Sequence, residues 1–232
     1  PLPNNYYTEN VRAVLCSVTT SILYLQSFHL DITLMSYRSP HLGANFLSEN
    51  FSGSREEAQV LDVACGLDGQ QMAELGFRHF VGVDGSKGML ELAAKTGPLS
   101  GPQTALLGTQ PLPAQTGVFD VVVIAGALDA GFVPVSVVRE MCHAAKPGGL
   151  CGMVRGDHTG APADKYKKDL ERELQLMEEE GLWSLVGIKR VDRYMEDPHV
   201  NPERDDVQDK PYISGTVYLY QKSIDTAVKS RD

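Results

Sequence analysis

The sequence predicts an α/β protein with a mostly parallel sheet, an antiparallel last strand and helices on both faces. From residue 59 onward, short apolar runs alternate with amphipathic stretches, which is the pattern of βαβ units. The run FDVVVI at residues 119–124 is rich in β-branched residues, as strands covered on both faces are. Two late apolar runs have no helix between them, so they should pair antiparallel, because a parallel pair needs a long crossover.

The expected strands are short and fall at regular intervals. In chain order they are Gln59–Ala64, Phe80–Asp84, Thr104–Leu107, Phe119–Ile124, Leu150–Val154, Val186–Val191 and Gly215–Tyr220. The segment from Glu196 to Lys210 is polar and acidic, so we expect a loop between the last two strands.

Helical periodicity fills the gaps between the expected strands. One apolar stripe consists of Val137, Val138, Met141, Cys142 and Ala145. The sequence Lys-Pro-Gly-Gly at 146–149 is expected to stop that helix and turn the chain into the fifth strand.

A longer helix is expected from a second apolar stripe, made of Tyr166, Leu170, Leu174 and Met177. Asp164 is the expected N-cap of this helix, and Gly181 is the expected first residue beyond it.

Length and composition fit one globular domain. The chain has 232 residues, of which 42% are hydrophobic and 22% charged. The formal net charge of −9 argues against a broad nucleic-acid surface, since such a surface needs many basic residues to neutralise phosphates. The four cysteines, Cys16, Cys65, Cys142 and Cys151, show no regular spacing and are expected to be free thiols.

Residues 14–30 form a largely uncharged segment, VLCSVTTSILYLQSFHL. It is short for a membrane span and is interrupted by Ser, Thr and Gln. We expect a buried helix or strand here, with an atypical N-terminus or a membrane anchor as the alternatives. We expect no membrane association for the protein and a location in the cytoplasm, with the nucleus as the alternative.

A nucleoside-binding constellation follows the first two strands. Gly66 and Gly69 lie in the turn after the first strand, where glycine lets the backbone approach a ligand. Asp84 ends the second strand, and an acid at this place can accept both hydrogens of a ribose diol. Nicotinamide-dependent oxidoreductases use the same arrangement. The alternative is that the glycines only form a tight turn and that Asp84 caps the next helix.

Four segments together resemble class I S-adenosylmethionine-dependent methyltransferases: LDVACG (61–66), GVDGSKGML (82–90), FDVVVIAGAL (119–128) and KPGGL (146–150). YRSPHL (37–42) and ISGTVYLYQK (213–222) are similar to a vertebrate branch of that family. The resemblance covers residues 31–223, leaving 1–30 as an atypical N-terminal segment and 224–232 as a tail. It implies a Rossmann-like seven-stranded sheet whose last strand is antiparallel.

The resemblance also implies a cofactor, S-adenosylmethionine, and the residues that hold it. Asp84 would bind the ribose hydroxyls, and the other implied positions are Ala64 and Gly66 at the methionine part, Gly85 and Met89 beside the adenine, Thr109 and Gln110 at the adenine edge, and Ala125 and Gly126 beneath the sulfonium.

Two departures from the family pattern concern this cofactor site. Asp68 stands where the family has the second glycine of its turn, and residues 1–30 lack the aromatic-rich helix that closes over the cofactor in many relatives. Both predict a weaker site. A methyltransferase-like binding or scaffold protein with weak or lost turnover is therefore the alternative function.

The sequence indicates less about the methyl-acceptor site than about the cofactor site. The polar candidates for the acceptor site, Asp129, Arg155, Asp157 and His158, follow the fourth and fifth strands. His158 is the preferred catalytic candidate, because imidazole titrates near neutral pH and can act as a base. We expect a monomer without a metal site that methylates a small molecule or a protein.

Overall fold

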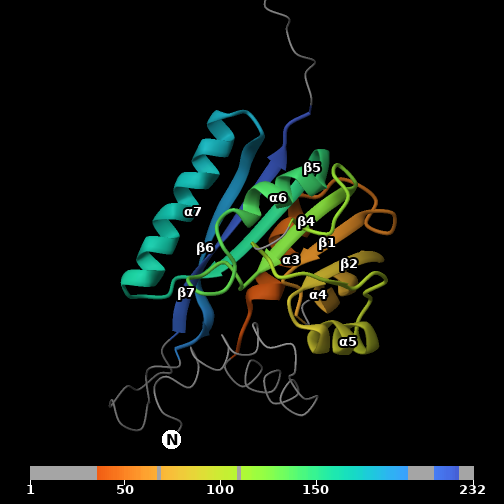
Figure 1. Cartoon of the computed structure of the whole chain (residues 1–232), viewed down its shortest axis with the longest axis horizontal. Helices are drawn as coiled ribbons and strands as arrows, with labels where there is room; N and C mark the ends of the chain where they lie inside the picture. The colour runs from red at the N-terminus through yellow and green to blue at the C-terminus, as the bar shows by residue number, and fades with distance from the viewer. Residues whose placement is uncertain (1–35, 67–68, 109–110, 198–211, 225–232) are drawn as a thin grey trace, which may run out of the picture.

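The computed structural model describes residues 36–66, 69–108, 111–197 and 212–224 (Figure 1). Its helices are α3 (Ser39–Asn50), α4 (Gly69–Glu74), α5 (Lys87–Thr96), α6 (Val137–Ala144) and α7 (Ala161–Glu179). Its strands are β1 (Gln59–Val63), β2 (His79–Asp84), β3 (Gln103–Thr104), β4 (Phe119–Ala125), β5 (Ala145–Gly156), β6 (Trp183–Glu196) and β7 (Tyr212–Lys222).

The described strands form one sheet in the order β3-β2-β1-β4-β5-β7-β6. Strands β1 to β5 pair parallel with one another, whereas β7 pairs antiparallel with both β5 and β6. The predicted fold class is thus confirmed, including the antiparallel last strand. The order reverses between β1 and β4, which is the place where open α/β sheets bind ligands.

Apolar side chains cover both faces of the sheet, and β4 shows why its sequence is so hydrophobic. Val122 and Ile124 point into the core formed with α6 and α7, whereas Val121 and Val123 point into the core formed with α3 and α4. Figure 1 shows α7 alongside β6 at one end of the sheet and α5 beside β2 at the other. Helices on both faces are therefore confirmed.

The Lys-Pro-Gly-Gly segment is not the turn that we expected. Helix α6 already ends at Ala144, and β5 begins at Ala145, so residues 146–149 belong to the strand. Ala145 pairs with Phe119, and Leu150 pairs with Val121. The extra residues form an irregularity in the strand, which Gly148 permits through its positive φ of 78°.

Helix α7 begins earlier than the sequence predicted. Gly160 is its N-cap, and Asp164 lies in the first turn, where its charge complements the helix dipole. The expected N-cap was wrong because Pro162, which suits the first helical turn, starts the helix before it. Gly181, with φ of 73°, follows the C-cap Glu180 as expected.

The remaining boundaries differ at strand ends. Strand β3 has only two residues, whereas β6 and β7 extend beyond both of their predicted ends. Cys65, Cys142 and Cys151 are buried and form no disulfide among the described residues, and Cys16 lies outside those residues. Residues 14–30 also lie outside them.

Within the described part of the chain, no helix is long and apolar enough to cross a membrane. The same residues contain no group of three His, Cys, Asp or Glu side chains placed to hold a metal ion.

Candidate functional site

Of the predicted cofactor residues that the structure describes, those at the carboxyl ends of β1, β2 and β4 are Ala64, Gly66, Asp84, Gly85, Ala125 and Gly126. Ala64 and Gly66 follow β1 with φ values of 54° and 44°, and Gly126 follows β4 with φ of 75°. A left-handed conformation is costly for alanine, so the fold holds Ala64 in a strained turn at this edge. This turn follows β1, so it lies at the point where the strand order reverses between β1 and β4.

Asp84 ties two of these turns together. Its Oδ2 accepts a hydrogen bond from the backbone N–H of Gly66 at 2.9 Å, and its Oδ1 accepts one from Ser86 at 2.8 Å. The residue is only 1% exposed. Burial raises the pKa of this carboxyl, and the backbone donors oppose that rise.

Helix α5, which follows Asp84, is capped by Ser86 and not, as the alternative interpretation had it, by Asp84. The Ser86 side chain accepts the backbone N–H of Met89 at 3.3 Å, which makes Ser86 the N-cap of α5. Asp84 therefore fixes the turn that carries the cap. Met89 is buried, and its Cε lies 3.7 Å from where a Cβ of residue 66 would stand. Gly85 lies between Asp84 and the cap.

Thr109 and Gln110 lie outside the described residues, as does Asp68. Gly108, just before them, has φ of 81° and lies against Pro134. The chain after β3 thus reaches the loop that follows β4.

Two tyrosines that the sequence reasoning missed meet at Gly126. The hydroxyl oxygen of Tyr37 lies 1.6 Å from where a Cβ of residue 126 would stand, and that of Tyr194 lies 3.2 Å from it. The two rings pack edge to face with centroids 5.5 Å apart. Tyr37 belongs to the YRSPHL segment, but nothing in its spacing to β4 indicates this contact.

The polar candidates for the acceptor side also come together. His158 Nε2 lies 3.8 Å from Asp129 Oδ2, and the ring of His158 stands edge-on to that of Tyr194 at 6.5 Å. Asp157 accepts hydrogen bonds from Ser214 and Thr216 on β7. The imidazole of His158 and the carboxylate of Asp129 are thus neighbours, at a distance longer than a hydrogen bond.

Arg155 is buried between these acids. Its guanidinium lies 3.9 Å from both Asp129 and Asp157 and is 1% exposed. Nε donates to the Leu128 carbonyl, whereas within the described chain neither terminal nitrogen has a hydrogen-bond partner. The charge links the loops that follow β4 and β5.

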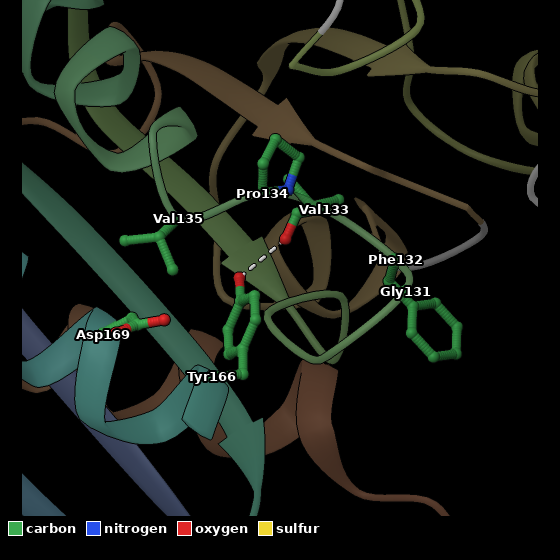
Figure 2. Close-up of a pocket in the computed structure, with 7 residues that line it drawn as sticks. All are labelled: Gly131, Phe132, Val133, Pro134, Val135, Tyr166 and Asp169. Carbon is green, nitrogen blue, oxygen red and sulfur yellow. Dashed lines mark hydrogen bonds between the residues drawn. The ribbon is translucent and has the colours of Figure 1, made fainter. Parts of the chain in front are cut away.

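A hollow lies beside this region, between the loop after β4 and helix α7 (Figure 2). It is lined by Gly131, Phe132, Val133, Pro134, Val135, Tyr166 and Asp169. The Tyr166 hydroxyl donates to the Val133 carbonyl at 2.7 Å and so fixes the loop to the helix. Among the residues that the structure describes, none of the predicted cofactor residues lines this hollow.

Solved structures confirm the architecture. A TehB-like S-adenosylmethionine-dependent methyltransferase from Corynebacterium glutamicum matches with a TM-score of 0.57 and 14% identity, over 88% of this chain and 100% of that one. The [4+2]-cyclase SpnF matches with a TM-score of 0.55 and 16% identity, over 80% and 81% of the two chains. At these identities the likeness shows the fold alone.

Sequence comparison is more specific. Methyltransferase-like protein 27 of Homo sapiens is 40% identical over 166 residues, which are 70% of this chain and 66% of the human protein. The match thus spans just under two thirds of the relative's length. It confirms the resemblance to the vertebrate branch. A family model described as a methyltransferase domain matches residues 54–197, more than half of the chain, and the chain therefore belongs to the methyltransferase domain family.

Proposed function

We propose that this protein transfers a methyl group from S-adenosylmethionine to a small molecule or a protein. The bond from the Gly66 amide to Asp84 carries the proposal, because it couples the turn after β1 to the end of β2. Family membership supports the methyltransferase activity. Both features favour a nucleoside bound across the carboxyl ends of β1, β2 and β4.

The residues present fit this cofactor. An ionised carboxylate has about four acceptor positions, and the backbone of Gly66, Ser86 and Gly85 takes up to three of them, so Asp84 keeps at least one for a ribose hydroxyl. Because Gly66 has no side chain, the space between its turn and Met89 stays open. Met89 and Gly85 would border the adenine there. Ala64, Ala125 and Gly126 would line the methionine and sulfonium end, with Thr109 and Gln110 at the adenine edge.

The cofactor supplies an activated methyl group, so the protein mainly has to align the acceptor. Where the acceptor must lose a proton, His158 would accept it on the nitrogen that does not face Asp129. Asp129 would orient the imidazole and balance its positive charge. Arg155 would attract the other carboxylate oxygen of Asp129, which lies 3.9 Å from its guanidinium.

Negative net charge supports a small-molecule or protein acceptor over nucleic acid. A monomeric state, a cytoplasmic location and the domain limits 31–223 remain our predictions. The alternative is a methyltransferase-like binding or scaffold protein, which Asp68 in the glycine turn favours.

A labelled-methyl assay tests the proposal. The protein is incubated with methyl-labelled S-adenosylmethionine and cell extract split into small-molecule, protein and nucleic-acid fractions. We expect label in one of the first two fractions, and none with Asp84→Ala. Label confined to nucleic acid would contradict the acceptor class. Cofactor binding without label in any fraction would favour the scaffold alternative.

A further inference from the structure

The hydroxyl groups of Tyr37 and Tyr194 converge on one point at the edge of the sheet. That point is the position that a Cβ would occupy on Gly126, which lies 1.6 Å from the Tyr37 oxygen and 3.2 Å from the Tyr194 oxygen. The Gly126 N–H donates to the Val154 carbonyl at 2.9 Å, so the glycine is fixed by the strand beside it. Two oxygen atoms therefore border the position directly after β4.

Hydrogen bonds hold the Tyr37 segment to the end of β6. The backbone N–H of Arg38 donates to the Tyr194 carbonyl at 2.9 Å, and the Ser36 hydroxyl donates to Glu196 Oε1 at 3.0 Å. Ser36 adopts a φ of 52°, which is unfavourable for serine. The contacts with β6 thus stabilise an unfavourable backbone conformation at Ser36, and they place the Tyr37 ring against Tyr194.

We infer that the hydroxyls of Tyr37 and Tyr194 recognise the positive charge on the sulfonium of the cofactor. This inference rests on the proposed function, in which Gly126 lies beneath the sulfonium. A hydroxyl oxygen carries partial negative charge and attracts a cation, and aromatic rings add to this attraction. S-adenosylhomocysteine, the product, is uncharged at sulfur. The tyrosines would therefore favour the cofactor over the product and help the product to leave.

Comparing the charged and the uncharged ligand separates this role from a structural one. Calorimetry measures the Kd of S-adenosylmethionine and of S-adenosylhomocysteine for the wild type, Tyr37→Phe and Tyr194→Phe. Each variant keeps the ring and removes only the oxygen. Tyr212→Phe is the matched control, since Tyr212 lies on β7 and packs against Arg193 instead of Gly126.

We expect each site variant to weaken S-adenosylmethionine binding about tenfold, the size of one interaction with a charged group. S-adenosylhomocysteine binding should change less than about twofold, and Tyr212→Phe should alter neither ligand. An equal effect on both ligands, no effect, or tighter binding of both would overturn the inference. A wild type that binds neither ligand would instead overturn the proposed function itself.

Discussion

The carboxylate of Asp84 accepts the backbone N–H of Gly66 at 2.9 Å and thereby joins the turn after β1 to the end of β2. Because Ser86 donates to the other oxygen at 2.8 Å, one side chain organises two turns at the ligand-binding edge. The Gly66–Asp84 pair is the structural basis of the site.

Asp84→Ala should remove most of the affinity for the cofactor and lower stability. It leaves the Gly66 and Ser86 amides without their acceptor, at a cost of about 1–3 kcal/mol for each amide that stays buried. Calorimetry with S-adenosylmethionine and urea unfolding measure the two effects. Asp169→Ala on α7, whose acid pairs with the exposed Lys165, is the control and should leave both unchanged. An unaltered Kd for Asp84→Ala would show that the ribose assignment is wrong.

Gly126→Ala should destabilise the protein and abolish cofactor binding. The backbone at φ 75° costs a non-glycine residue about 1–2 kcal/mol, and the new methyl group would overlap the Tyr37 hydroxyl. Gly117→Ala separates the two causes, because residue 117 has φ of 70° but no atom within 4 Å of its Cβ position. Chemical denaturation should show a larger loss for residue 126. Equal losses would mean that Tyr37 does not press on this position.

His158→Asn should lower the rate of methyl transfer about 10²-fold for an acceptor that loses its proton in the transition state. Cofactor affinity should stay at the wild-type value, since His158 faces Asp129 and Tyr194 at the acceptor side. Turnover is measured with the acceptor that the labelled-methyl assay identifies. His79→Asn, an exposed residue at the start of β2, is the control. Full activity in His158→Asn would eliminate the imidazole as the base.

Stability should fall between about pH 10 and 12. Burial, together with the charge of Glu171, raises the pKa of Tyr218 from 10.0 to about 12, and burial with Glu178 does the same for Tyr220. The unfolded phenols ionise near 10 while the folded ones remain protonated, so the stabilisation is complete below 10 and is lost as pH rises through 12.

Unfolding in urea, followed by the fluorescence of Trp183, measures this alkaline loss. Trp183 is the single tryptophan and stacks on Tyr220 at 4.5 Å. Tyr218→Phe should reduce the pH dependence, because its ring stays while the ionising group is gone. An identical pH profile for wild type and variant would contradict the assignment.

Local sequence patterns predicted the sheet but missed contacts between distant segments. β4 was recognisable because Val121 to Ile124 must satisfy an apolar core on each face. Asp84 was recognisable because a fixed spacing separates it from the glycine turn. Tyr37 and Tyr194 were missed, since only the antiparallel return of β6 and β7 brings residue 194 to residue 126. The early start of α7 was missed because Pro162 outweighed the N-cap preference of Asp164.

The most direct test of the central claim is calorimetry of the wild-type protein and Asp84→Ala with S-adenosylmethionine, with NAD as the competing nucleotide. We expect the wild type to bind S-adenosylmethionine, Asp84→Ala to lose most of this affinity, and NAD to produce no binding heat. Tight binding of NAD, or binding of S-adenosylmethionine that does not depend on Asp84, would contradict this claim.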